Sequence, residues 1–320
     1  MRQTGVRSMV EGGLLAAIAI IFAVISAYLP IIGPFVDLLW PVPIILLGVR
    51  HGYKWSIMAT VVAGVMIAML LHPLQAVNVV VGFGLIGIVL GYAFRMEFSP
   101  AKTMLWGSIA SLLSKIALLA IGVAITGINP FNMQGEVMAQ AVEQAVEVYR
   151  SFGMAEQELA TMQESMQTII EIMKIILPAG FILASVIDTY LNFLIAKVVL
   201  KKLGHSIPDL PPFKHWMLPD YIVYFFALAL VMIYWGKSRE ITMLYNIGMN
   251  IQVITSMLLL VQGLALFYFI VDKYNLSRVV RGIILFLILT NGLFSQILIF
   301  AGAIDTIIDY RHLRIARKIE

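Results

Sequence analysis

The sequence contains nine apolar runs separated by charges, prolines or glycines, and most are long enough to cross a lipid bilayer. A helix of about 20 apolar residues spans the roughly 30 Å hydrocarbon layer. Of all residues, 61% are hydrophobic and 12% are charged, whereas soluble domains have about 45–50% apolar and about 25% charged residues. The sequence therefore predicts an all-α integral membrane protein, a polytopic helical bundle of eight or nine transmembrane helices. The expected spans are residues 11–29, 35–49, 53–71, 75–94, 104–126, 172–199, 219–236, 242–271 and 279–304.

The second expected span is short and contains Pro41 and Pro43. Proline lacks the N–H group of a regular helical hydrogen bond, and membranes tolerate the freed carbonyls only where neighbours or a cavity satisfy them. We therefore expect these prolines to break the helix and this span to line part of a cavity.

Lysine and arginine residues near the span ends predict the orientation of the chain, because short cytoplasmic loops are rich in these residues. Placing the N-terminus in the cytoplasm puts Arg50, Lys54 and Arg95 on that side. Residues 128–171, with seven glutamates and a single arginine, then lie outside. We expect a multi-pass protein of a bacterial plasma membrane with a cytoplasmic N-terminus.

The C-terminal tail conflicts with a count of nine spans. Nine crossings would leave this tail outside, but Arg311, Arg314, Arg317 and Lys318 favour the cytoplasm. Either one weak segment does not cross, or the tail is an exception to the charge rule, and the sequence leaves both options open.

The acidic outer segment has apolar residues at helical spacing on both sides of Ser151, Phe152 and Gly153, which predicts two amphipathic helices. They either pack on the bundle or form a lid over an outward cavity. The predicted organisation is a six-span bundle (1–127 and 172–203), the acidic helices (128–171), a cytoplasmic proline-rich loop (204–218), C-terminal transmembrane segments (219–304) and a basic tail (305–320).

Polar residues within the spans are the candidate functional residues, because ionisable groups in hydrocarbon are costly. Lys115 and Asp188 each lie about 11 residues from the inner end of their span, at a depth of about 16 Å. We predict an ion pair between them, which either clamps two helices or contacts a solute or ion. Weaker candidates for lining a pocket are Asp37, His72, Gln75, Asn78 and Asn192.

Several functional classes lack their sequence signals. The chain has no cysteine, which excludes disulfides and thiolate metal sites. It has no P-loop, H-E-x-x-H or G-x-S-x-G motif, so it does not bind ATP by a P-loop. The net charge of +4 comes from clusters between apolar runs, which does not favour nucleic-acid binding. We expect no enzymatic activity, catalytic residue, cofactor or metal.

Residues 11–19, 37–48 and 50–52 resemble the start of the substrate-binding subunits of energy-coupling-factor vitamin transporters. This resemblance covers about residues 1–200 and implies a pocket for a small molecule that opens to the outer face. It also implies that Ala19, Ala23 and Ala27 form a stripe that docks onto a coupling subunit, whereas packing within the bundle explains the same small residues without a partner.

A closer resemblance covers nearly the whole chain. Residues 188–192, 201–204, 210–219 and 305–311 are similar to the YybS-like family of uncharacterised bacterial multi-span membrane proteins, which implies a fold related to the vitamin-binding subunits. The predicted function is recognition or translocation of a small solute. The alternative is a non-catalytic membrane scaffold that binds other membrane subunits through helix contacts. The expected partners are the lipid bilayer, other membrane subunits and a small solute.

Overall fold

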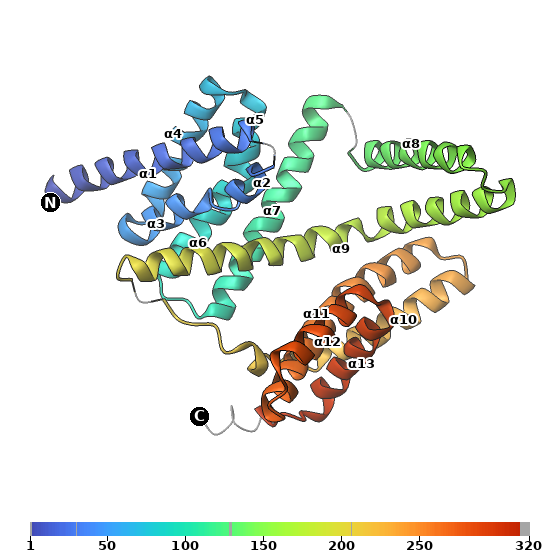
Figure 1. Ribbon diagram of the computed structural model, residues 1–320. Coiled ribbons are helices and arrows are strands. Elements are labelled where there is room, and N and C mark those ends of the chain that lie inside the picture. The colour runs from blue at the N-terminus through green and yellow to red at the C-terminus, as the bar shows by residue number, and fades with distance from the viewer. Residues whose placement is uncertain (1, 30, 128–129, 206, 314–320) are drawn as a thin grey trace. The chain divides into compact units, whose positions relative to one another are not determined.

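The computed structural model describes residues 2–29, 31–127, 130–205 and 207–313, and most of these residues are helical (Figure 1). It divides into two compact units: unit 1 comprises residues 1–154 and 181–209, and unit 2 comprises residues 155–180 and 210–320. Within the described ranges, eight helices are long and apolar enough to span a bilayer, or nine if one bent pair counts as a span. The predicted all-α architecture of eight or nine spans is therefore confirmed.

Unit 1 contains five of these candidate spans and the C-terminal part of a sixth helix. Its elements are α1 (Arg2–Tyr28), α2 (Gly33–Asp37), α3 (Pro41–His51), α4 (Tyr53–Leu70), α5 (Pro73–Val79), the π-helix η1 (Val80–Gly84), α6 (Leu85–Arg95), α7 (Pro100–Thr126), α8 (Pro130–Ser151) and part of α9 (Glu156–Lys202).

The second expected span consists of α2 and α3, and Pro41 is the first residue of α3. Pro41 and Pro43 therefore start this helix and do not interrupt it, contrary to our expectation. The first N–H groups of a helix have no helical acceptor, so proline costs no hydrogen bond there.

The core of unit 1 is built around α3, where Ile44, Ile45 and Leu47 are fully buried. Two glycines of α6 allow its close approach: a Cβ atom at Gly91 would lie 3.0 Å from the Ile45 carbonyl oxygen, and one at Gly87 would lie 3.1 Å from the Ile44 side chain. Small residues at such spacing let membrane helices pack closely.

Helix α9 is continuous over 47 residues, about 70 Å at 1.5 Å per residue. The second predicted amphipathic helix and the sixth predicted span are thus one element, visible as the long helix of Figure 1. The division between the units falls within α9 at residues 180 and 181, whereas the sequence suggested a boundary near residue 172. The first predicted amphipathic helix corresponds to α8.

Pro178 lies inside α9 without ending it. The Ala179 N–H group, which in a regular helix would bond to the Ile175 carbonyl, donates to Asn250 Oδ1 at 2.9 Å. Asn250 Nδ2 in turn donates to the Ile175 oxygen at 2.7 Å. The Asn250 amide therefore bridges the backbone groups that proline would otherwise leave unpaired, as buried helix breaks in membranes require.

Unit 2 contains the N-terminal part of α9, the 3₁₀ turn η2 (Phe213–His215), α10 (Tyr221–Ser238), α11 (Thr242–Lys273), α12 (Arg278–Thr290) and α13 (Gly292–Ile308). Helices α11 and α13 cross closely because both carry glycine at the crossing. A Cβ atom at Gly263 would lie 2.2 Å from the Leu298 carbonyl oxygen, and one at Gly302 would lie 2.2 Å from the Leu259 oxygen.

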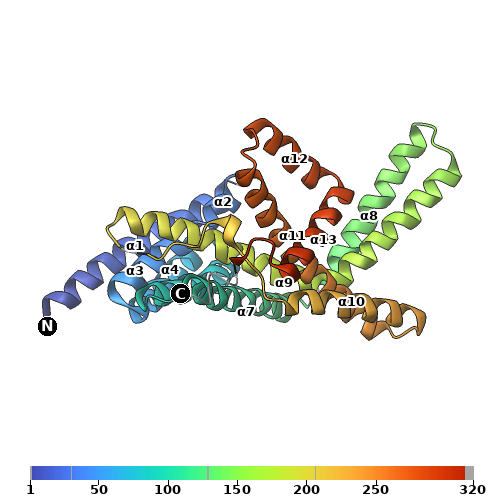
Figure 2. The same ribbon diagram turned by 90° about the horizontal axis from the view of Figure 1, so that it is seen from below.

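Helices α12 and α13 form a bent pair with an angle of 102°, and Figure 2 shows them meeting at this bend. The start of α12 contacts the end of α11 through Arg281 and Asp272 (3.2 Å). Tyr310, which follows the C-cap of α13, lies at the same end of α11. There Lys273 Nζ donates to the Tyr310 hydroxyl at 3.3 Å. At 13 residues, α12 is about 20 Å long and too short to cross alone. These contacts favour a re-entrant pair over a broken span.

Candidate functional site

A polar cluster joins α7 and α9 inside unit 1. Lys115 Nζ lies 3.0 Å from Asp188 Oδ2 and donates to Ser111 Oγ at 2.7 Å. The Ser111 hydroxyl donates to the same carboxylate oxygen at 2.7 Å. On the other side, Asn192 Nδ2 donates to Asp188 Oδ1 at 3.0 Å. The structure therefore brings together Lys115, Asp188 and Asn192 from the sequence-based candidates and adds Ser111.

Helical geometry explains how four side chains converge. Ser111 and Lys115 are four residues apart on α7, as are Asp188 and Asn192 on α9, so each pair shares a helix face. The two helices meet where Gly107 leaves room for Thr189: a Cβ atom at Gly107 would lie 2.4 Å from Thr189 Cγ2. The spacing of Ser111 from Lys115 was the signal that sequence reasoning missed.

The cluster lies deep within the expected membrane layer. Lys115 is 15 residues from the start of α7 and 11 from its end, which places it about 22 Å and about 16 Å from the two helix termini. The side chains of Lys115 and Asp188 are 24% and 15% exposed within the protein, so the protein does not bury the ion pair completely.

Three buried polar atoms beside the ion pair have no hydrogen-bond partner among the described residues: Ser114 Oγ, Thr189 Oγ1 and Asn192 Oδ1. Buried polar atoms are nearly always hydrogen-bonded, so each unpaired one needs an explanation. A carboxylate, an ammonium group and unpaired hydroxyl and amide oxygens together offer both donors and acceptors to a polar ligand.

The other predicted pocket residues do not join this cluster. His72 is the N-cap residue of α5, and Gln75 and Asn78 lie within this helix. His72 and Asn78 are exposed. His72 Nδ1 accepts from the Leu74 N–H group at 3.2 Å, which is a helix cap. Asp37 ends α2. None of the hydrogen bonds described for the chain joins these four residues to Asn192, and their pocket-lining role stays a prediction.

The alanine stripe of α1 is used largely within unit 1. Ala19 and Ala23 are fully buried there, whereas Ala27 is exposed. The first two alanines therefore pack within unit 1, and the docking role of the stripe stays a prediction.

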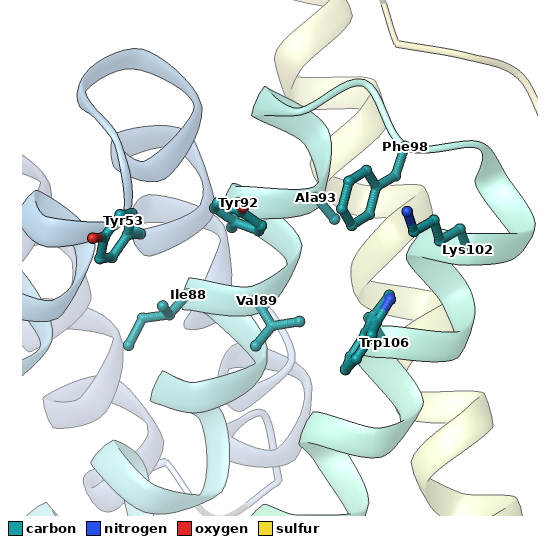
Figure 3. Close-up of a pocket in the computed structure, with 8 residues that line it drawn as sticks. All are labelled: Tyr53, Ile88, Val89, Tyr92, Ala93, Phe98, Lys102 and Trp106. Atoms are coloured by element: carbon teal, nitrogen blue, oxygen red, sulfur yellow. The ribbon is translucent and has the colours of Figure 1, made fainter.

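A cavity of about 530 Å³ lies on unit 1 beside α4, α6 and α7. Figure 3 shows that the rings of Tyr53, Tyr92, Phe98 and Trp106 surround it, with Lys102 at one side. The Lys102 ammonium lies 4.0 Å from the centre of the Phe98 ring, a cation–π contact. Sequence reasoning missed this cavity, although aromatic residues near span ends were its available signal.

A second cluster of buried charges holds unit 2 together. Arg311 Nη2 lies 2.8 Å from Asp305 Oδ2, and both side chains are fully buried. Arg311 also donates to the carbonyl oxygens of Lys214 and Trp216 at 2.5 and 2.7 Å. Gln262 Nε2 donates to Asp305 Oδ2 at 2.7 Å. This arrangement joins α11, α13 and the segment before α10. Arg314, Arg317 and Lys318 lie outside the described residues.

These features define a multi-pass helical membrane protein with a polar cluster inside its bundle. The chain belongs to the family described as predicted membrane protein (DUF2232), whose model matches residues 17–306. It is 26% identical over 311 residues to the uncharacterized protein YybS of Bacillus subtilis (strain 168), covering 95% of this chain and 97% of that protein. No solved structure matches the chain. The predicted YybS-like membership is confirmed.

Proposed function

We propose that this protein binds a small polar solute inside the membrane at the Lys115–Asp188 cluster, as a step in its recognition or translocation. The observation that carries the proposal is a partly accessible ion pair at mid-helix depth with three unpaired polar atoms beside it. A purely structural pair would be expected to satisfy the polar groups around it, since an unsatisfied group in hydrocarbon costs several kcal/mol.

The chemistry of the cluster suits a solute that carries both donors and acceptors. Asp188 accepts hydrogen bonds, Lys115 donates them, and Asn192 Oδ1 offers a further acceptor. A solute that binds here would replace part of the Lys115–Asp188 contact with its own groups, so binding and the ion pair would compete. The same class of function is what the sequence resemblance to vitamin-binding subunits implies.

A membrane scaffold is the second candidate. It is favoured by the scattering of Asp37, His72, Gln75 and Asn78, which the solute hypothesis expected to share a pocket. In a scaffold, the Lys115–Asp188 pair would only clamp α7 to α9.

Native mass spectrometry of the purified full-length protein after incubation with a bacterial metabolite extract separates the two functions. We expect a small molecule retained by the wild type and lost in Asp188→Asn and in Lys115→Gln. The matched control, Asp209→Asn, removes an exposed carboxylate of the same unit and should retain it.

The thermal stability of the same variants tests the alternative that the ion pair only clamps α7 to α9. If nothing is retained by the wild type, and the double variant Lys115→Gln/Asp188→Asn is more stable than either single variant, the pair is a clamp and the solute proposal is wrong. The reasoning is that each single change leaves one uncompensated charge in the membrane.

A further inference from the structure

A polar cavity, separate from the aromatic one, lies where α1 begins and where α3 and α9 end. Its volume is about 580 Å³, within the roughly 300–1,000 Å³ range of small-molecule pockets. The residues that line it are Arg7, Ser8, Glu11, Val49, Arg50, His51 and His205, all of unit 1. The proposed solute site on α7 and α9 does not include any of these residues.

Glu11 organises the cationic side chains of this cavity. Its carboxylate accepts from Arg7 Nε at 3.1 Å, from Arg50 Nη1 at 3.3 Å and from His51 Nε2 at 2.8 Å. His51 Nδ1 lies 2.7 Å from Ser8 Oγ. Both ring nitrogens of His51 are thus held, and the imidazole cannot rotate without losing a contact.

The cavity keeps a positive character after this pairing. Two arginines, two histidines and a single carboxylate line the cavity, which gives a formal charge of +1 with the histidines counted as neutral. Within the described chain, each guanidinium reaches Glu11 through one nitrogen, and an arginine carries five N–H donors. The remaining donors of Arg7 and Arg50 are therefore available to an anion.

The helix ends around the cavity carry further basic residues. Arg50 and His51 lie in the last turn of α3, and His205 follows the C-terminus of α9, which carries Lys201 and Lys202 in its last turn. Arg7 is 78% exposed at the mouth, so a ligand can reach the cavity from solvent or from the lipid surface. Guanidinium groups bind phosphate oxygens with strong, charge-assisted hydrogen bonds.

We propose that this cavity binds the phosphate group of an anionic ligand. Arg7 and Arg50 donate to the phosphate oxygens, His205 adds a ring N–H donor, and Glu11 with His51 fixes the positions of the two arginines. The phosphate is carried either by an acidic phospholipid of the adjacent leaflet or by a soluble phosphorylated molecule, and the two sources share the same recognition chemistry.

The test uses the full-length protein and two probes. Native mass spectrometry with dioleoylphosphatidylglycerol, set against zwitterionic dioleoylphosphatidylcholine, measures the lipid source. Calorimetric titration with inorganic pyrophosphate, in phosphatidylcholine nanodiscs, measures the soluble source. We expect the wild type to bind at least one probe selectively, and the responding probe identifies the source.

The variant Arg7→Gln/His205→Gln removes two cationic side chains but leaves the Glu11 contacts of Arg50 and His51. We expect its affinity for the responding probe to fall about tenfold or more, the loss expected of a charge-assisted contact. Lys54→Gln removes an exposed positive charge near the same end but outside the cavity and should leave binding unchanged. Equal weakening by Lys54→Gln, or no selective binding of either probe, would overturn the proposal.

Discussion

Replacing Arg311 with methionine should be among the most damaging single substitutions in unit 2. Methionine keeps much of the apolar volume but removes two hydrogen bonds to Asp305 Oδ2 and two to the carbonyl oxygens of Lys214 and Trp216. Asp305 would keep Gln262 as a partner but would become an uncompensated buried charge. Removing one partner of a buried ion pair costs about 3–5 kcal/mol, so we expect a loss of this size in the free energy of unfolding.

The double variant Arg311→Met/Asp305→Leu separates two contributions: the loss of the ion pair, and the cost of leaving the Asp305 carboxylate buried without a cation. It removes both charges, so the remaining cost is two carbonyl oxygens and the Gln262 amide without partners, about 1–3 kcal/mol for each group that stays buried and unsatisfied. Because neither charge is left unpaired, and the freed groups can find new partners on relaxation, we expect the double variant to be more stable than Arg311→Met alone.

We would rank the stability of these variants by thermal unfolding in a single detergent, with intrinsic tryptophan fluorescence as the signal. Arg239→Met makes the same chemical change at an exposed position and should shift stability by no more than about 0.5 kcal/mol. The reasoning fails if Arg311→Met behaves like Arg239→Met, or if the double variant is less stable than Arg311→Met.

Three further predictions concern the fold. Asn250→Leu leaves the backbone groups beside Pro178 without partners and should cost about 1–3 kcal/mol for each, measured by thermal unfolding; an unchanged midpoint would contradict the bridging role. The ammonium groups of Lys197 and Lys201 lower the pKa of Asp209 from 3.8 to about 2, so this contact is fully present above pH 3.8 and is lost as the pH falls through 2; a carboxyl ¹³C titration with a midpoint near 3.8 would refute it. If α12 and α13 are re-entrant, cysteines introduced at positions 209 and 310 of this cysteine-free chain should react with an impermeant maleimide from the same side of the membrane, and labelling from opposite sides would support a ninth crossing.

The spans could be predicted because the bilayer imposes a length and an apolar composition on any helix that crosses it. The same information did not predict that the second amphipathic helix and the sixth span form one helix, α9. It also did not predict that Asn250, 71 residues further along the chain, pairs with the backbone beside Pro178. Nor did it predict the bend between α12 and α13, because hydropathy counts residues and does not detect a contact such as that between Lys273 and Tyr310.

Of the candidate sites, the ion pair could be predicted from the sequence, and the cavities could not be predicted in the same way. Lys115 and Asp188 could be placed together because consecutive spans usually touch and both residues lie at a similar depth. The cavity around Glu11 could not be found from the sequence, because it depends on which way side chains point after several helices have packed. The aromatic cavity of Figure 3 left only a partial signal, the aromatic residues near span ends, which does not show that their rings surround one space.

Helix α9 has a consequence for how the protein is made. Both compact units are discontinuous in the chain, and this one helix supplies a segment to each. The ribosome must therefore release residues 181–209 before the first unit has all its parts, and by then the opening segment of the second unit has already emerged. No single cut divides the gene into two self-sufficient halves, so truncated forms that stop near residue 154 should be recognised by the cell as incomplete and degraded.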